Sequence, residues 1–290
     1  MPDPFAAPPP TKWNFLSLGA GVQSSALAMM AAHGEITPTP DAAIFADTQA
    51  EPKAVYEWLQ WLTAEIQKKP HPFPVEIVTQ GDLEAEALTM RTTKDGRKFS
   101  RTDIPLFTKN DDGTKGMIPH RSCTVDYKIK PIRKLVKELA AIKRGQKEIT
   151  VTQWIGISWD EFQRMKGSRD AWCQNRWPLI EGRLARAECL QWMRDQGYPE
   201  PPRSACVFCP YRHDREWRNL KRDDPEGFAR AAEFDDEMRR VKRNSAIFKT
   251  ETYLHGSLIP LSQIDFSNDF DRGQLPLCQN FNNECEGMCG

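Results

Sequence analysis

The stretch "FLSLGAGVQSSALAMMAAH", Phe15 to His33, decides how the chain begins to fold. An apolar run breaks at Gly19-Ala20-Gly21, passes through Gln23 and Ser24, and resumes with helix-like spacing. Small residues let backbone amides approach a ligand closely, and the amides at a helix start attract anions. The stretch therefore predicts a strand, a turn that cradles a phosphate, and a helix that begins near Ser24. An ordinary strand-to-helix turn stays open as the alternative on this stretch alone.

The composition bounds the class of protein. A chain of 290 residues is long enough for one large domain with an appendage. Lys and Arg number 40 and Asp and Glu number 40, so no global basic field favours nucleic-acid wrapping, although local patches stay open. No apolar run approaches the roughly 20 residues that span a bilayer. Residues 1–12 are expected to be a disordered tail without an export signal, which predicts a cytoplasmic protein without membrane association.

Strands alternate with helices along the first half of the chain. The apolar patterns predict strands over 13–18, 42–47, 74–80 and 148–158, and helices over 24–33, 51–69 and 130–144. This alternation is typical of an α/β domain with a mostly parallel sheet. The polar segment 91–121 is expected to be a long loop whose Arg and Lys residues either contact phosphate or are solvated. From residue 183 the pattern is helical, and the basic run 239–243 is expected to form a solvated face at a helix end.

The cysteines indicate a metal site. Eight are present, and without an export signal we expect a reducing compartment, where metal binding is favoured over a disulfide framework. Cys206 and Cys209 form a CxxC pair, which suits two ligands of one metal centre or a redox dithiol. Two further thiolates would come from Cys123 and from the tail, where Cys285 and Cys289 lie. By count alone, four thiolates hold zinc or a 4Fe-4S cluster equally well.

Several segments fall in the order of a known family. They are "GAGVQS" (19–24), "FADT" (45–48), "CTVDYKIKP" (123–131), "GISWDEFQR" (156–164) and the run from "PLIEG" (178–182) to the CxxC pair. Together they resemble the PP-loop adenine-nucleotide alpha-hydrolase superfamily and, within it, the phosphoadenosine phosphosulfate (PAPS) reductase-like family. The resemblance implies a Rossmann-like α/β PP-loop domain over 13–182, followed by a helical, Cys-rich C-terminal region over 183–290.

The resemblance also implies a set of site residues. The nucleotide-binding positions would be Ser17, Gly19, Ala20, Gly21, Gln23, Ser24, Asp47, Thr48, Arg121, Gly156 and Asp160. Lys128 and Arg164 would contact phosphate or sulfate and act in catalysis, with Cys285 as the nucleophile. The metal ligands would be Cys123, Cys206, Cys209 and Cys289, and the resemblance favours a 4Fe-4S cluster over zinc. A helix N-cap at Asp47 and surface ion pairs at Lys128 and Arg164 are the structural alternatives.

Two reactions follow from the resemblance. In the first, the substrate is PAPS or adenylylsulfate (APS), the Cys285 thiolate attacks its sulfur, and a thioredoxin-like reductant resolves the product. In the second, the protein is an ATP pyrophosphatase that adenylates an acceptor and modifies or thiolates a nucleic acid. A nucleotide-binding module without catalytic activity is a third interpretation.

Three positions differ from the family pattern. Gln23 stands where ATP pyrophosphatases have Asp, and Ser158 stands where the reductases often have Arg. Cys123 is followed by Thr124 instead of a second cysteine. The change at Gln23 favours a sulfonucleotide over ATP, and the single Cys123 changes how a cluster would be ligated. The tail differs as well: the catalytic Glu-Cys-Gly-Leu/Ile-His segment of the reductases appears only as "ECEGMCG" (284–290), so Cys285 is either the nucleophile or a metal ligand.

Overall fold

A parallel five-stranded sheet forms the centre of the molecule. The computed structural model describes residues 5–101, 104–119, 122–245 and 250–267. The strand order is β3-β2-β1-β8-β9, and every neighbouring pair is parallel. The strands are β1 (Trp13–Leu18), β2 (Ala42–Asp47), β3 (Val75–Thr79), β8 (Val151–Ile155) and β9 (Cys173–Arg176). The expected α/β class with a parallel sheet is confirmed, whereas the short polar strand β9 was missed.

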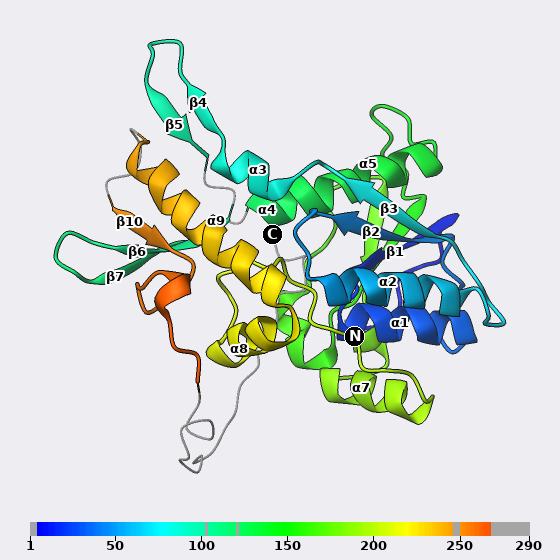
Figure 1. The fold of residues 1–290 in the computed structure, drawn as a ribbon. Helices are drawn as coiled ribbons and strands as arrows, with labels where there is room; N and C mark the ends of the chain where they lie inside the picture. Colours follow the sequence, from blue (N-terminus) through cyan, green and yellow to red (C-terminus); the bar gives the residue numbers. More distant parts are fainter. Residues whose placement is uncertain (1–4, 102–103, 120–121, 246–249, 268–290) are drawn as a thin grey trace.

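Helices cover both faces of this sheet. On one face lie α1 (Val22–His33) and α2 (Lys53–Ile66), and on the other lies α5 (Lys130–Leu139) (Figure 1). Side chains alternate along β1, so Leu16 and Leu18 pack toward α1 whereas Phe15 packs toward α5. Because both faces are covered, the strands are apolar on both sides. Helix α7 (Arg186–Asp195) then packs against α1.

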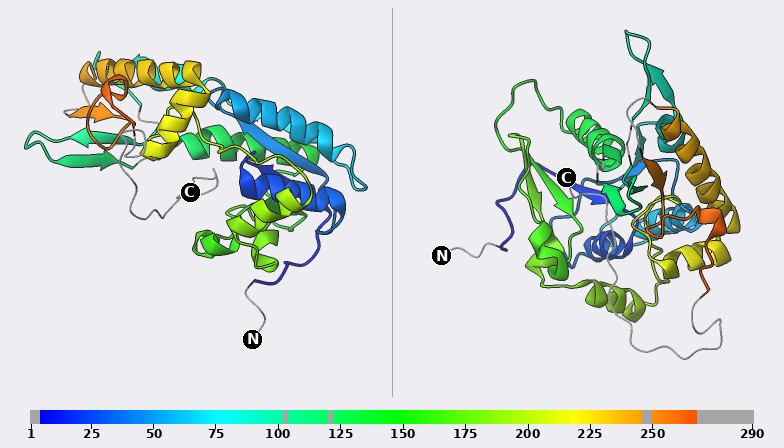
Figure 2. Two further views of the ribbon diagram at one scale, coloured as in Figure 1. Left: turned by 60° about the horizontal axis from the view of Figure 1, so that its bottom comes forward. Right: turned by 90° about the vertical axis from the view of Figure 1, so that its left-hand side faces the viewer.

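A second hydrophobic core lies beside the sheet. It is formed by α3 (Leu83–Leu88), α8 (Asp214–Asp223) and α9 (Pro225–Arg243), together with a small sheet in the order β10-β6-β7 (Figure 2). The strands of that sheet are β6 (Leu106–Lys109), β7 (Lys115–Ile118) and β10 (Glu251–Tyr253). Each of the two cores therefore draws on residues from both sides of position 182, where a domain boundary is predicted.

The prediction of one long loop over 91–121 is wrong. The segment contains a hairpin of β4 (Met90–Thr92) and β5 (Lys98–Ser100), and then the antiparallel pair β6 and β7. Short turns close both hairpins, with Thr93 N donating to Arg97 O at 2.9 Å and Asn110 N donating to Thr114 O at 2.9 Å. The four strands are short and only partly buried, so they carry little of the apolar alternation that marks a strand in a sequence.

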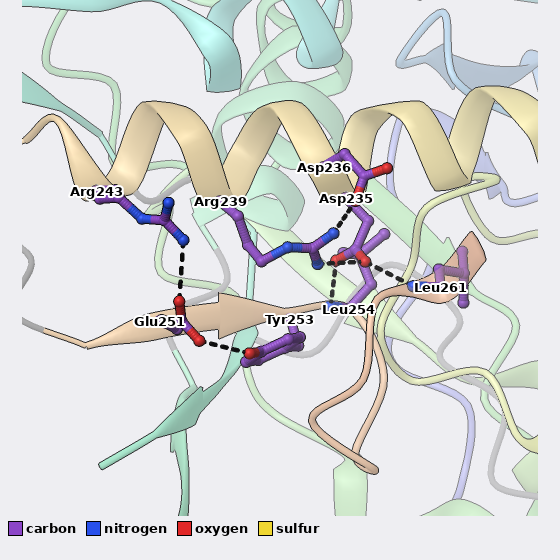
Figure 3. A network of polar contacts seen from close by, with 8 residues as sticks. All are labelled: Asp235, Asp236, Arg239, Arg243, Glu251, Tyr253, Leu254 and Leu261. Atoms are coloured by element: carbon purple, nitrogen blue, oxygen red, sulfur yellow. Dashed lines mark hydrogen bonds and ion pairs between the residues drawn. The ribbon is translucent and has the colours of Figure 1, made fainter. Parts of the chain in front are cut away.

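A network around a buried carboxylate fastens β10 to α9. Asp235 is 1% exposed and accepts hydrogen bonds from the backbone amides of Leu254 at 2.8 Å and Leu261 at 2.9 Å (Figure 3). Arg239, one turn later on α9, pairs with the same carboxylate. The carboxylate satisfies two buried amides and one cation, so it fixes the chain after β10 against the helix.

The basic run at the end of α9 is not wholly solvated, contrary to expectation. Lys242 is 1% exposed, and its Nζ donates to Ser100 Oγ at 2.6 Å and to Arg101 O at 2.5 Å. A lysine can bury its ammonium group in this way because hydrogen bonds replace those of water. The side chain thereby ties α9 to the β4–β5 hairpin.

Candidate functional site

The turn between β1 and α1 has the form that the sequence predicts. Helix α1 begins at Val22 with Gly21 as its N-cap residue, two residues before the expected start. Gly19 N donates to Ser24 Oγ at 3.2 Å, which folds the turn back onto the first helical turn. Ala20 has φ of 59°, a left-handed conformation that is unusual for a residue with a Cβ atom. Backbone amides and a hydroxyl thus gather at a helix N-terminus, which suits an anion.

A cavity lies at this turn, with about 510 Å³ of empty space, part of which is open solvent. Its polar lining comes from four separate segments: Ser17, Gly19, Ser24, Lys128, Gly156 and Arg164. Its apolar lining comes mainly from the ends of β1, β2 and β8. Six of the predicted site residues therefore meet in one cavity at the carboxyl edge of the sheet, where open α/β folds bind ligands.

Gly156 lets the end of β8 approach α1. A Cβ atom at this position would lie 3.1 Å from both the backbone N and the Cα of Ser24. Backbone atoms at a helix start cannot move aside as the end of a flexible side chain can. A side chain at position 156 would therefore displace the first turn of α1, which frames the cavity.

Gln23 and Ser158, two of the positions that differ from the family pattern, are neighbours. Gln23 is 2% exposed, and its Nε2 donates to Ser158 Oγ and to Glu161 Oε2, each at 3.4 Å. Arg186 Nη1 donates to Gln23 Oε1 at 3.1 Å. Burial raises the pKa of Glu161, while the adjacent Arg164 opposes that rise. Two neutral side chains are thus in contact where ATP pyrophosphatases have Asp and the reductases often have Arg, and Arg186 of α7 holds Gln23 in place.

Asp160, a predicted nucleotide ligand, is engaged elsewhere. One of its carboxylate oxygens accepts a hydrogen bond from the backbone N of Arg186 at 3.1 Å, at the first turn of α7. Asp160 does not line the cavity. The structure thus gives this carboxylate a contact with a helix start instead of a place at the cavity wall.

Asp47 and Thr48 lie at the end of β2. The Asp47 carboxylate accepts hydrogen bonds from Gln49 N at 2.7 Å and from Tyr56 Oη at 2.8 Å. Burial and this hydrogen bond raise the pKa of Tyr56. Pro52 is the N-cap residue of α2, so Asp47 does not cap that helix. Thr48 is 1% exposed, and its Oγ1 lies 3.3 Å from Cys206 Sγ.

The CxxC pair lies beside Lys128. Lys128 Nζ is 3.1 Å from Glu51 Oε1, whose side chain is 0% exposed. Burial opposes the charge of Lys128, but Glu51, together with Cys206 and Cys123, outweighs that effect and raises the lysine's pKa. Burial, followed by the charge of Glu51, raises the pKa of Cys206. Since Lys128 also lines the cavity, one side chain connects the predicted anion site to the cysteines.

The loop that carries the CxxC pair is fixed by backbone contacts. Val207 N donates to Ala50 O at 2.7 Å, which joins this loop to the segment after β2. Cys209 N donates to Cys206 O at 2.9 Å, so the pair forms a tight turn. Cys206 and Cys123 both pack against the second core. The loop is therefore part of the second core and is bonded to the segment that follows β2.

Arg212 and Glu51 were not predicted as site residues. Arg212 is 8% exposed and donates to the carbonyls of Ala205 at 2.7 Å and Cys206 at 3.1 Å. It makes no ion pair with any described residue, and burial, with the nearby Arg203, lowers its pKa to about 10. Glu51 Oε2 is buried and has no hydrogen-bond partner within the described ranges. Charged residues next to turn residues are usually surface groups, so the sequence carries no sign that these two are buried.

Part of the predicted site cannot be placed. Arg121, Cys285 and Cys289 lie outside the described residues. Among the residues that are described, no three His, Cys, Asp or Glu side chains are grouped closely enough to hold a metal ion. No helix in that part of the chain is both long enough and apolar enough to cross a bilayer. The metal centre therefore stays a prediction in which the CxxC pair supplies two ligands.

Comparisons with other proteins identify no family for this chain. No protein-family model matches the chain, and no curated protein is similar to it. The family resemblance consequently depends on the segments quoted above and on the way in which the fold brings them together.

Proposed function

We propose that the protein is an enzyme that binds an adenine nucleotide at the β1–α1 turn and performs sulfur chemistry on it. The anionic end of the nucleotide would lie against the backbone amides after Gly19 and the hydroxyl of Ser24. Arg164 and Lys128 would neutralise its charge, because both line the same cavity. The proposal is supported by the position of six residues that the resemblance assigns to the site, because all six line the same cavity.

The position of Lys128 is the observation that carries the proposal. Lys128 lines the cavity and its ammonium group pairs with Glu51, while its charge also interacts with Cys206. A phosphate or sulfate in the cavity would therefore lie close to thiol groups. This arrangement suits a reaction in which a sulfur atom of the bound nucleotide is attacked or transferred.

Sulfonucleotide reduction is the reaction we favour, with PAPS or APS as the substrate. Lys128 and Arg164 would hold the substrate's anionic groups and stabilise the charge that stays on the departing nucleotide. The Cys285 thiolate would form a bond to the sulfur as the bond from that sulfur to the phosphate oxygen breaks. A thioredoxin-like reductant would then release the sulfur group as sulfite and regenerate the thiol after a further exchange.

A metal centre at the cysteines is part of the proposal. Cys206 and Cys209, completed by Cys123 and Cys289, would hold a 4Fe-4S cluster or zinc. The buried Arg212, which has no carboxylate partner among the described residues, favours negatively charged sulfur at the CxxC turn. When bound, such a centre would fix these cysteines, and with them the Cys123 segment that carries Lys128, beside the cavity.

ATP-dependent modification is the second candidate. It is favoured by a second cavity that adjoins the first and whose lining includes Lys130, Arg133 and Arg169, where an acceptor could bind. In that reaction Lys128 and Arg164 would hold the phosphates of ATP while the acceptor is adenylated. The resemblance suggests that this acceptor is a nucleic acid. Release of pyrophosphate rather than sulfite distinguishes the two reactions.

The test is a binding and turnover panel on anaerobically purified protein. We expect PAPS or APS to bind in calorimetry and, with thioredoxin present, to yield sulfite. Arg164→Lys should weaken binding about tenfold because one ammonium group cannot replace a bidentate guanidinium. Arg144→Lys, at an exposed position outside the cavity, is the matched control. Pyrophosphate release from ATP would favour the second candidate, and failure of all three nucleotides to bind would overturn the proposal.

A further inference from the structure

A carboxylate, an imidazole and a hydroxyl from two distant parts of the chain are joined by hydrogen bonds. The Nε2 atom of His255, in the loop after β10, lies 2.9 Å from Oδ1 of Asp214, the first residue of α8. The Nδ1 atom of the same ring lies 2.8 Å from Ser257 Oγ. None of the three side chains lines the cavity at the β1–α1 turn. Groups of these types in this order are able to activate a serine as a nucleophile.

The hydrogen bonds determine which ring nitrogen of His255 carries the proton. The backbone N–H of Ser257 can only donate, and it donates to Nδ1 at 3.1 Å. Nδ1 is therefore an acceptor, so in the neutral ring the proton lies on Nε2 and faces the carboxylate of Asp214. The hydroxyl of Ser257 must then donate to Nδ1 as well. The imidazole is thus oriented as a base for this hydroxyl, and the carboxylate stabilises the charge that the ring acquires.

The loop between Leu254 and Leu261 is held at both ends. The backbone amides of these two residues bond to the same buried carboxylate on α9 (Figure 3). Within the loop, the His255 side chain is 14% exposed, and its ring meets that of Phe266 edge-on at 5.6 Å. Ser257 is exposed. The base is therefore fixed in place, while the hydroxyl is open to a substrate.

Two features of the surroundings favour a reaction at this hydroxyl. Leu258, the residue after the serine, has φ of 59°, a strained conformation of the kind that gathers at functional sites. Lys115 of β7 reaches the residue before the serine, because a Cβ atom at Gly256 would lie 2.5 Å from Lys115 Nζ. An ammonium group there can stabilise the negative charge that develops on the oxygen of a carbonyl group under attack.

We propose that Ser257, His255 and Asp214 form a site that hydrolyses carboxylic esters, with Lys115 beside it. The serine oxygen bonds to the ester's carbonyl carbon as its proton passes to His255 Nδ1. The bond from that carbon to the alcohol oxygen then breaks, and the alcohol leaves with this proton. Water, deprotonated by the same nitrogen, releases the acyl group as a carboxylic acid and restores the serine. This activity goes beyond the proposed function and needs no nucleotide.

The first experiment treats the full-length protein with a fluorophosphonate, which reacts selectively with activated serines, and locates the adduct by peptide mass spectrometry. We expect the label on Ser257. His255→Gln should slow labelling about a hundredfold or more, because the base is gone. His71→Gln, which changes an exposed histidine elsewhere, should label at the wild-type rate. No label on Ser257, or equally fast labelling in folded His255→Gln, would overturn the proposal.

The second experiment follows hydrolysis of p-nitrophenyl acetate, again without a nucleotide. Ser257→Ala should abolish turnover, whereas Ser262→Ala, at an exposed serine of η3 (Leu261–Gln263), should keep it. Both positions are exposed, so both variants should fold even if His255→Gln does not. Equal turnover by wild type and Ser257→Ala would refute the site.

Asp214→Asn tests the carboxylate as a positioning residue. The amide oxygen can still accept from His255 Nε2, but it lacks the charge that stabilises a protonated ring. We expect kcat for the same ester to fall about tenfold or more while KM stays unchanged, a separation that a merely structural role would not produce. Asp223→Asn, at the other end of α8, is the matched control and should keep the wild-type kcat. An unchanged kcat in Asp214→Asn would remove Asp214 from the proposed site.

Discussion

At the scale of single residues, the ion pair of Lys128 with Glu51 combines a structural and a functional role. The Glu51 side chain is fully buried and that of Lys128 is 18% exposed, so removal of the lysine leaves a carboxylate without a counter-charge. Removing one member of such a pair costs about 3–5 kcal/mol, whereas removing both charges costs much less. The two roles can therefore be separated by a double substitution.

We expect Lys128→Met to lower the free energy of unfolding by about 3–5 kcal/mol, and Glu51→Gln/Lys128→Met to recover most of that loss. The double variant should still bind the nucleotide at least tenfold more weakly, because the cation at the cavity is gone. Urea unfolding and calorimetry measure the two effects. Lys134→Met, at an exposed position on α5, is the control. Wild-type nucleotide affinity in the double variant would exclude Lys128 from the site.

Gly156→Ala tests the contact between β8 and α1. The new Cβ atom would be 3.1 Å from the Ser24 backbone, so we expect a loss of about 1–3 kcal/mol in stability and weaker nucleotide binding. Gly19→Ala is the matched control, because its Cβ atom would meet only Ser24 Oγ at an ordinary 3.5 Å. Its stability should change by no more than about 0.5 kcal/mol. Equal effects of the two substitutions in thermal unfolding would refute the close approach as the reason for a glycine at 156.

At the scale of elements, Asp235 determines how the chain after α9 is held. Asp235→Asn places an amide NH₂ group against either a backbone N–H or Arg239. We expect the free energy of unfolding to fall by about 3 kcal/mol or more. Asp236→Asn removes the neighbouring carboxylate, which is 55% exposed and also pairs with Arg239. It should cost less than about 1 kcal/mol in the same denaturant titration. Similar losses in both variants would contradict the role given to the buried network.

The sequence predicts the elements of the first core well and those of the second core poorly. Strands β1 and β2 have the predicted bounds because uninterrupted apolar runs of this length are typical of strands that are buried on both faces. The hairpins within 91–121 escaped prediction because their partners lie far away in the sequence: β5 contacts α9, and β6 pairs with β10. For the site, glycines and serines at a strand end were informative. The burial of Glu51 and Arg212 depends on tertiary packing and leaves no local pattern.

At the scale of the whole molecule, the CxxC turn belongs to the second core and contacts Thr48, at the end of β2, so a metal there would hold separate parts of the chain together. We expect anaerobically purified protein to contain iron and acid-labile sulfide, and Cys206→Ala/Cys209→Ala to lose both and to unfold at a lower temperature. Cys189→Ala removes a buried cysteine of α7 and should keep the metal. Colourless protein with stoichiometric zinc would refute the cluster. Metal retained in the double variant would refute the site.

The composition of the second core also has a consequence for synthesis of the chain on the ribosome. Leu83, Ile104 and Leu106 leave the ribosome roughly 100 residues before α8 and α9, with which they share the second core. At about 5–20 residues per second, this delay lasts about 5–20 s. During that interval Leu83, Ile104 and Leu106 have no helix to cover them, although each is buried in the finished protein. The speed of translation over residues 110–240 therefore sets how long these apolar side chains stay exposed before α8 and α9 are made. Synonymous codons in that region should change the yield of folded protein.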